Sequence, residues 1–258
     1  MSIRTSAVVG ALAGAAAALV LGLGAVAFGL RERPLEDTRI HDYLLAHPQV
    51  LMAMSEKLQK QQQRHQEETR QGAVLKLGAK AFFDPHFAFI FGPKNARNTF
   101  VEFFDYNCPY CRASVPVVRK FMVAHLKDAR FAFIEFPIKG RESVLASRAA
   151  IAARNQPDKY LDFHFRLMSE LNFVSENVLF DDAKKAGLDV ERLKADMQRP
   201  TVDMAISAAH SLAEAANIDG TPAFIVNGRL REGVLNDKLL ARLLREGRSP
   251  KRDRYAAR

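Results

Sequence analysis

The sequence contains 258 residues, of which 48% are hydrophobic and 26% are charged, and its formal net charge is +9. A chain of this size and composition can bury a sizeable core in one domain, with room for an added segment. It contains only two cysteines, Cys108 and Cys111, which excludes a framework of several disulfides and a metal site of four thiolates within one chain. Part of the positive charge lies in a basic tail, residues 249–258, which we interpret as a solvated chain end. Because zinc-finger spacing and basic repeats are absent, we expect no nucleic-acid partner.

The N-terminal stretch predicts a leader that crosses or enters a membrane. Residues 6–30 contain no charged side chain, and Arg4 and Arg31 stand on either side of them. A stretch of this length can span a bilayer, which needs about 20 residues, while Ala-Val-Ala at residues 25–27 is typical of a signal-peptide cleavage site. Residues 1–30 are therefore expected to be a signal peptide or an inner-membrane anchor. Either alternative predicts a periplasmic or other extracytoplasmic location, where disulfide chemistry is available.

Residues 31–82 are predicted to form a helical segment that cannot bury its apolar side chains alone. A short amphipathic pattern covers residues 40–45, and Pro48 is suited to the first turn of a second helix. That helix begins with apolar residues and continues, over residues 60–68, as a shaft that is polar on all sides. Such a helix packs against a copy from another chain or serves as a spacer. We therefore expect residues 35–80 to form either a homo-oligomer contact or a spacer.

From residue 83 onwards the pattern changes to strands and helices. Two strands are followed by a helix that begins near the cysteine pair, a third strand, a helical block with breaks at Gly187 and Pro200, two further strands and a closing helix. Asn227-Gly228, between the last two strands, is the strongest hairpin signal in the chain. In chain order, these elements are expected at residues 87–91, 98–104, 109–127, 130–136, 142–211, 223–226, 229–231 and 235–244.

This order of elements predicts an α/β fold of the thioredoxin plan, in which a strand–helix–strand unit is followed by a hairpin and a helix. The domain is expected over residues 83–248. A helical insertion, at residues 141–211, is expected between its two halves.

The cysteine pair predicts dithiol–disulfide exchange. Cys108 and Cys111 lie between an apolar strand and a helix that Pro109 can begin, and Pro109 and Tyr110 form the active-site loop between them. The first thiol then lies at the positive end of a helix, which stabilises a thiolate. The second lies one turn away, where it can attack a mixed disulfide formed on the first. Cys108 is therefore the predicted nucleophile and Cys111 the predicted resolving thiol.

Two segments resemble the active-site segments of DsbA-like thioredoxin-fold proteins. Residues 101–111, VEFFDYNCPYC, resemble the segment that carries that family's dithiol, and residues 220–224, GTPAF, resemble its cis-proline loop. The resemblance covers residues 87–246. Residues 40–58 are also similar to the N-terminal segment of the suppressor-of-copper-sensitivity C proteins, which in some of them mediates trimerisation. By this resemblance the chain is identified as a DsbA-like disulfide oxidoreductase, with most similarity to disulfide isomerases of the second group.

The resemblance also implies further site residues. It implies that Pro222 is a cis residue facing the dithiol, with Thr221 beside it free to pair with an incoming peptide. It matches Glu102 to the family's buried acid below the dithiol, which could relay the proton of Cys111. Two departures, Tyr110 where the oxidase DsbA has histidine and Thr221 where it has valine, favour an isomerase or a reductase over a simple oxidase.

Neither a metal nor a cofactor is predicted. His164 and His210 are interpreted as core or surface residues rather than as ligands, and no histidine lies near the two cysteines in sequence. Tyr106 and Tyr110 are expected at the rim of the site, where they shape the substrate surface or only pack.

These observations predict an exported oxidoreductase of the oxidase or isomerase type that acts on disulfides of other proteins. Its expected partners are cysteine-containing exported substrate proteins and a membrane redox partner that resets the dithiol. Two alternative functions stay open. One is a module that holds a soft ion such as Cu(I) through the cysteine pair, and the other is a glutaredoxin-like reductase, a family that Cys-Pro-Tyr-Cys also resembles.

Overall fold

A computed structural model describes residues 37–246 of the chain. The expected leader at residues 6–30 and the basic tail at residues 249–258 lie outside the described residues. Within the described range, no helix combines the length and the apolar character that crossing a membrane requires. The chain divides into two compact units after His65.

The N-terminal unit, as far as the structure describes it, is helical and has no core of its own. It contains a helix over residues 37–46 and the first part of α2, Pro48–Leu77. His47 separates the two helices and Pro48 begins the second, as the sequence predicts. More than half of the surface is exposed for seven large apolar side chains of this unit, which are Ile40, Tyr43, Leu45, Leu51, Met52, Met54 and Leu58.

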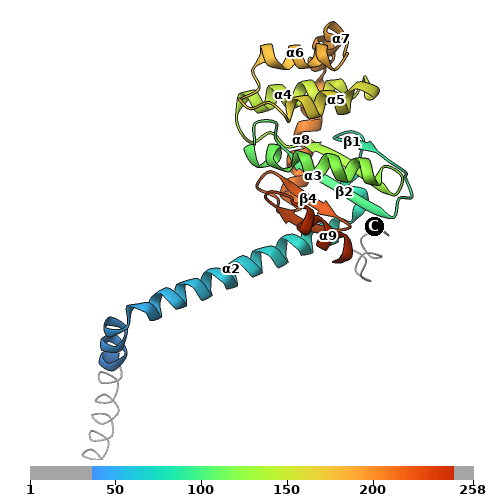
Figure 1. Cartoon of the computed structure of the whole chain (residues 1–258). Helices are drawn as coiled ribbons and strands as arrows, with labels where there is room; N and C mark the ends of the chain where they lie inside the picture. Colours follow the sequence, from blue (N-terminus) through green and yellow to red (C-terminus); the bar gives the residue numbers. More distant parts are fainter. Residues whose placement is uncertain (1–36, 247–258) are drawn as a thin grey trace, which may run out of the picture. The chain divides into compact units, whose positions relative to one another are not determined.

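The second unit contains the end of α2 and every described element that follows it (Figure 1). The order of strands and helices is the one that the sequence predicts, and it confirms the α/β thioredoxin plan with a helical insertion. These elements are η1 (Ala79–Phe82), β1 (Ala88–Phe91), β2 (Asn98–Phe104), α3 (Pro109–His125), β3 (Ala129–Glu135), α4 (Arg141–Ala153), α5 (Pro157–Leu167), α6 (Glu176–Lys185), α7 (Val190–Met197), α8 (Pro200–Ala215), β4 (Ala223–Val226), β5 (Arg229–Glu232) and α9 (Asp237–Glu246).

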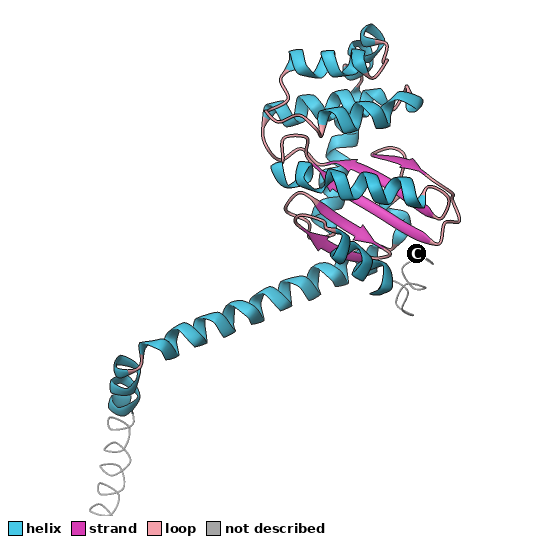
Figure 2. Ribbon diagram, in the orientation of Figure 1, coloured by secondary structure: helices cyan, strands magenta, loops and turns pink. Residues whose placement is uncertain are grey.

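The strands form one five-stranded sheet in the order β1-β3-β2-β4-β5 (Figure 2). The central strands β2 and β3 are parallel, and all other neighbours are antiparallel. The predicted hairpin joins β4 and β5: Asn227 and Gly228 both have positive φ angles, of 50° and 79°. Two consecutive positive φ angles are the requirement of a two-residue type I′ turn, which explains the preference for Asn-Gly.

Two hydrophobic clusters cover the two faces of this sheet. Along β2, Phe100 and Phe104 belong to the first cluster and Val101 and Phe103 to the second, because side chains alternate between the faces of a strand. Residues of α3, α9 and the helices from α4 to α7 complete the first cluster. Residues of α8, η1 and the end of α2 complete the second. The central strand β2 is therefore buried on both sides, and the loop that leaves it reaches the first cluster.

The helical insertion consists of separate helices rather than of one continuous block. Gly187 follows α6 with a φ of 77°, a left-handed conformation that favours glycine, and Pro200 occupies the first turn of α8. The helices α4 to α7 gather beside the sheet, as Figure 1 shows. The last helix of the insertion, α8, continues to Ala215 and covers the face of the sheet that carries the second cluster.

Residues 66–82, which the sequence analysis groups with the N-terminal segment, pack in the second unit. Val74 and Phe82 are fully buried there. The Arg70 guanidinium pairs with Asp219 at 2.8 Å and also with Glu232. Gln71 donates to the Gly228 carbonyl at 2.7 Å and accepts from the Leu230 amide at 3.1 Å. The contacts of Arg70 and Gln71 are polar, and therefore the pattern of hydrophobic residues in the sequence does not reveal them.

Candidate active site

The cysteine pair lies where β2 leads into α3. Cys108 is the N-cap residue of α3 and Pro109 occupies its first turn. Both cysteines are unpaired thiols, and both are buried in the first hydrophobic cluster. A proline at this position removes a backbone N–H that would have no partner within the helix, so that the helix can begin directly after the nucleophile. The Cys108 amide itself donates to the Asp105 carbonyl at 3.1 Å.

The loop before β4 brings Thr221 to the first cysteine, although the two residues are far apart in sequence. The Cys108 thiol donates a hydrogen bond to the Thr221 carbonyl, with 3.2 Å between sulfur and oxygen. The peptide bond between Thr221 and Pro222 is cis. The hydroxyl oxygen of Thr221 is buried and makes no hydrogen bond within the described residues. The structure therefore places Thr221 and Pro222 at the dithiol.

The two thiols differ in acidity because their surroundings differ. The Cys111 thiol has the largest effect on the pKa of Cys108, and the nearby Thr221 side chain and the amides of Cys111 and Tyr110 add to it. Together they lower this pKa to about 5 against the opposing effect of burial. Burial raises the pKa of Cys111 far above its ordinary value, and the Cys108 thiol and the Glu102 carboxylate add to this. Near neutral pH Cys108 therefore loses its proton far more readily than Cys111. The first can attack a disulfide, and the second must lose a proton before it reacts.

Glu102 lies on the central strand, on the face that carries the dithiol. Its backbone pairs with Phe133 of β3 and Phe224 of β4, whose side chains belong to the first cluster. Only 3% of Glu102 is exposed. Burial raises the pKa of its carboxyl group to about 8, because no water stabilises the charged form. The carboxyl group can therefore hold or release a proton near neutral pH.

The two tyrosines near the cysteines have different positions. Tyr110 is 61% exposed, at the rim as expected. Tyr106, also expected at the rim, is fully buried, and its hydroxyl lies 3.0 Å from Nδ1 of His164. Burial lowers the pKa of His164 to about 3, so its ring is neutral and can accept the hydrogen bond from the tyrosine. His164 is thus a core residue, as the sequence analysis interprets it. Tyr106 anchors the active-site loop to α5.

The sequence analysis missed Asp105, whose buried carboxylate organises the loop before the nucleophile. One oxygen accepts from the Asn107 amide and from the Ser143 hydroxyl, each at 2.7 Å. The other accepts from the amides of Ile138 and Lys139 at 2.7 and 2.9 Å. An aspartate directly after an apolar strand often bonds to the backbone two residues on, and this was the available signal. The bonds to residues 138–143 depend on the tertiary fold.

Two further residues that the sequence analysis missed connect the dithiol to the loop between α5 and α6. Arg112 donates to the Tyr106 carbonyl at 3.1 Å and to the Asn172 carbonyl at 2.8 Å. The Asn107 side chain accepts from the Val174 amide at 2.8 Å. Asn107 directly precedes Cys108 and Arg112 directly follows Cys111. No pattern in the sequence indicates these bonds, because their partners lie in an irregular loop.

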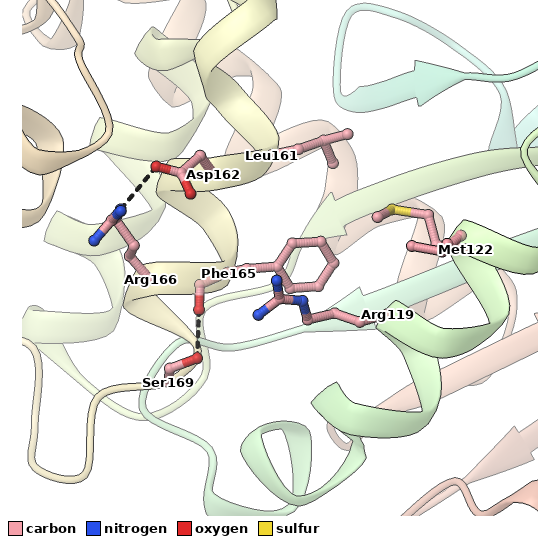
Figure 3. Close-up of a pocket in the computed structure, with 8 residues that line it drawn as sticks. Arg119, Met122, Leu161, Asp162, Phe165, Arg166 and Ser169 are labelled. Carbon is pink, nitrogen blue, oxygen red and sulfur yellow. Dashed lines mark hydrogen bonds and ion pairs between the residues drawn. The ribbon is translucent and has the colours of Figure 1, made fainter.

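A pocket of about 570 Å³ lies between α3 and α5, apart from the dithiol (Figure 3). Arg119 extends over the ring of Phe165, with its guanidinium carbon 5.1 Å from the ring centre. None of the predicted site residues lines this pocket. Among the described residues, no group of three or more histidine, cysteine or acidic side chains could hold a metal ion.

Two family models match the chain. One, described as thioredoxin, matches residues 87–246, which is more than half of the chain. The other, described as the copper resistance protein ScsC N-terminal domain, matches residues 37–64.

Solved structures with similar folds cover most of the chain. A thioredoxin-like oxidoreductase from Silicibacter pomeroyi DSS-3 is 38% identical, with a TM-score of 0.60, over 65% of this chain and 95% of that chain. BcfH from Salmonella enterica Typhimurium is 26% identical, with a TM-score of 0.72, over 87% of this chain and 99% of that chain.

The curated relatives include both short and long proteins. Disulfide bond formation protein D of Bacillus subtilis is 29% identical over 152 residues, which are 55% of this chain and 68% of that protein. The chain spans only 24–26% of the length of other curated relatives, which are Na(+)/H(+) antiporters of Salinispora and Herminiimonas species. The matched fold, the dithiol at the start of α3 and the family model lead to one conclusion: this chain belongs to the thioredoxin family, in the DsbA-like group of disulfide oxidoreductases that also contains ScsC proteins.

Proposed function

We propose that this protein is an exported thiol–disulfide oxidoreductase that acts on disulfides of other proteins, with Cys108 as nucleophile and Cys111 as resolving thiol. The observation that carries the proposal is the difference between the two thiols. Cys108 lies at the start of α3 with its pKa lowered to about 5, and Cys111 is buried with its pKa raised. A pair that only stabilises the fold does not need one thiol kept ionised and the other protonated.

The first step is the attack of the Cys108 thiolate on a substrate disulfide. A new bond forms between the Cys108 sulfur and one substrate sulfur, while the substrate's own sulfur–sulfur bond breaks. The other substrate sulfur leaves as a thiolate and takes up a proton. The Thr221 carbonyl, which accepts from the Cys108 thiol in this structure, lies beside the new bond and can pair with the substrate backbone.

The second step depends on Cys111 and Glu102. The Cys111 thiol gives its proton to the Glu102 carboxylate, and the resulting thiolate attacks the Cys108 sulfur. The substrate then leaves as a dithiol, with two electrons gained, and the Cys108–Cys111 pair becomes a disulfide. Alternatively, a second substrate thiolate attacks the mixed disulfide first, and the substrate leaves with a rearranged disulfide while the pair stays reduced.

Isomerase or reductase activity is favoured over simple oxidation. Thr221 stands where the oxidase DsbA has valine before its cis-proline, and Tyr110 stands where that oxidase has histidine. The N-terminal unit exposes a row of apolar side chains that would be covered by copies of the same chain. An assembly with several dithiols can hold one substrate at more than one cysteine, which suits rearrangement.

The proposal extends to location and partners. The uncharged residues 6–30 would direct the chain out of the cytosol or anchor it in the inner membrane, and the dithiol would then act in the periplasm. Its substrates would be exported proteins with cysteines. An isomerase must be kept reduced in an oxidising compartment, so a membrane redox partner would supply electrons to the Cys108–Cys111 disulfide.

One experiment tests the proposal and separates its variants. The reduction potential of the Cys108–Cys111 pair is measured against glutathione, and the same protein is assayed for refolding of a scrambled disulfide protein and for oxidation of a reduced one. Recovery of the scrambled protein supports an isomerase, whereas rapid oxidation alone supports an oxidase. A protein that exchanges no disulfide, with glutathione or with either substrate, would refute the proposal. Titration with Cu(I) in the same preparation tests the alternative of a soft-metal module.

A further inference from the structure

The loop between α5 and α6, residues 168–175, presents two large apolar side chains to solvent. Leu171 is 93% exposed and Phe173 is 63% exposed, while Val174, the next residue, is fully buried. Side chains of this size gain nothing from exposure, since burying each one is worth an appreciable hydrophobic free energy. We call these two exposed side chains, on alternate residues of one loop, the α5–α6 patch.

The backbone under the patch is fixed at both ends. The Asn172 carbonyl, between the two exposed side chains, accepts from Arg112 at 2.8 Å. The Val174 amide donates to the Asn107 side chain, also at 2.8 Å. Asn107 is itself held, since its amide group lies 3.3 Å from the Ser143 hydroxyl and its backbone N–H donates to Asp105. The patch is therefore built into the same hydrogen-bond network that positions the active-site loop.

This network also fixes where the patch lies. Its two anchors are the residues directly before Cys108 and directly after Cys111. The Thr221 carbonyl contacts the Cys108 sulfur itself. A substrate cysteine that bonds to Cys108 must bring its neighbouring residues onto the surface around the dithiol, and an extended chain advances about 3.3 Å per residue. Residues a few positions from that cysteine are then within reach of the α5–α6 patch.

We propose that Leu171 and Phe173 are specificity residues, which bind a bulky apolar side chain close to the reacting cysteine of an extended substrate segment. This inference rests on the proposed function and adds the sequence preference of its substrates. The occupant is an apolar side chain rather than a charged one, because the patch itself offers only hydrocarbon and ring surface. The Arg112 guanidinium below it is already engaged by three carbonyl oxygens, of Tyr106, Asn172 and the Asn107 side chain.

Two peptides test the inference. Each is extended and carries one cysteine in a mixed disulfide with glutathione; one has leucine and phenylalanine next to the cysteine, and the other has serine at both positions. The reduced full chain is assayed for release of glutathione from each peptide, with dithiothreitol to return the Cys108–Cys111 disulfide to the dithiol between turnovers and with a blank that lacks the protein. The readout is the ratio of kcat/KM for the apolar peptide to kcat/KM for the serine peptide. We expect a ratio of about ten in the wild-type protein, as burial of one apolar side chain would give.

The double substitution Leu171→Ser and Phe173→Ser is expected to bring this ratio close to one. Its effect should lie mainly in KM, since the chemistry at Cys108 is unchanged. Met204→Ser is the matched control: Met204 is 67% exposed on α8, the helix that covers the opposite face of the sheet, and its loss should leave the ratio at the wild-type value. A wild-type ratio of one, or a ratio that survives the double substitution, would overturn the inference. If the wild-type protein releases glutathione from neither peptide, the proposed function fails instead.

Discussion

Apolar side chains are exposed in the unit that ends at His65 and buried in the unit that begins at Gln66. In the second unit most of them fill two clusters around one sheet, and the exposed ones include Leu171 and Phe173. In the first unit, the residues from Ile40 to Leu58 form helices that leave most of their large apolar side chains exposed in the described part of the chain. Helices of this kind are stabilised by packing against other helices. The contrast supports the proposal that one unit carries the chemistry and the other joins copies of the chain.

The largest effect is expected from Cys108→Ser. A serine hydroxyl is not ionised at neutral pH and cannot take part in sulfur exchange, so the rate of disulfide exchange should fall at least about a thousandfold. The oligomeric state should stay unchanged, because Cys108 lies in the other unit. Both are measured on the same preparation, by glutathione release and by sedimentation. If the variant keeps its rate of disulfide exchange, Cys108 is not the nucleophile.

The complementary change is deletion of residues 37–65. We expect the assembly to dissociate to monomers, since the exposed apolar side chains that would join the copies are removed. Exchange with glutathione should stay within about twofold of the wild-type rate, because the dithiol and its hydrogen bonds lie beyond His65. The yield of correctly refolded protein from a scrambled disulfide substrate should fall, because a monomer offers only one dithiol to each substrate.

Sedimentation of the intact exported part decides this prediction. If that part is a monomer before the deletion, the N-terminal unit is a spacer instead. Deletion as far as residue 80 is a poor substitute, because it would also remove Arg70, Gln71 and Val74, which pack in the second unit.

Within the second unit, Glu102→Gln tests whether the buried acid is protonated at neutral pH. The folded-state pKa of Glu102 is raised to about 8, above an unfolded value near 4.5, so the folded protein binds the proton more tightly than the unfolded one. Its contribution to stability is fully present below about pH 4.5 and is lost as the pH rises to about 8. At 1.36 kcal/mol per pH unit, the loss could reach about 5 kcal/mol.

The glutamine variant has no proton to lose at this position, so the pH dependence should disappear from its stability. Free energies of unfolding are measured in urea at several pH values between 4.5 and 8.5, with both proteins in the disulfide form so that the cysteines do not titrate. The difference between wild type and variant should fall steadily with pH. A constant difference would mean that the pKa of Glu102 is not raised, so that its carboxyl group could not hold the Cys111 proton near neutral pH as proposed.

The smallest effect is expected where α2 joins the second unit. Arg70→Ala removes the partner of Asp219 and of Glu232, a half-buried carboxylate whose pKa is raised by burial. Loss of this pairing should reduce the free energy of unfolding by about 1–2 kcal/mol. Arg242→Ala is the control, because the Arg242–Glu246 pair at 3.8 Å is exposed and should contribute less than about 0.5 kcal/mol. Equal effects of the two substitutions would show that Arg70 does not anchor α2.

The sequence by itself determined the cysteine pair, the loop of Thr221 and Pro222, and the elements in which they lie. The apolar runs gave the strands, and Pro109, Asn227-Gly228 and Pro200 marked the positions where elements begin or turn. These signals are local, because backbone preference and the alternation of side chains act over a few residues. The resemblance of residues 101–111 and 220–224 then named the site residues that the structure brings together.

Only the tertiary structure decided how those residues behave. Glu102 could have been a surface carboxylate, and it is buried because β3 and β4 flank its strand and the first cluster covers it. Tyr106 lies in the core and not at the expected rim, and His164 accepts a hydrogen bond from its hydroxyl. The network of Asp105, Asn107 and Arg112 joins residues that are 30 to 70 positions apart in the chain, and it ties the loop of the α5–α6 patch to Asn107 and Arg112. Burial and long-range hydrogen bonds depend on which elements pack together, and no local pattern contains that information.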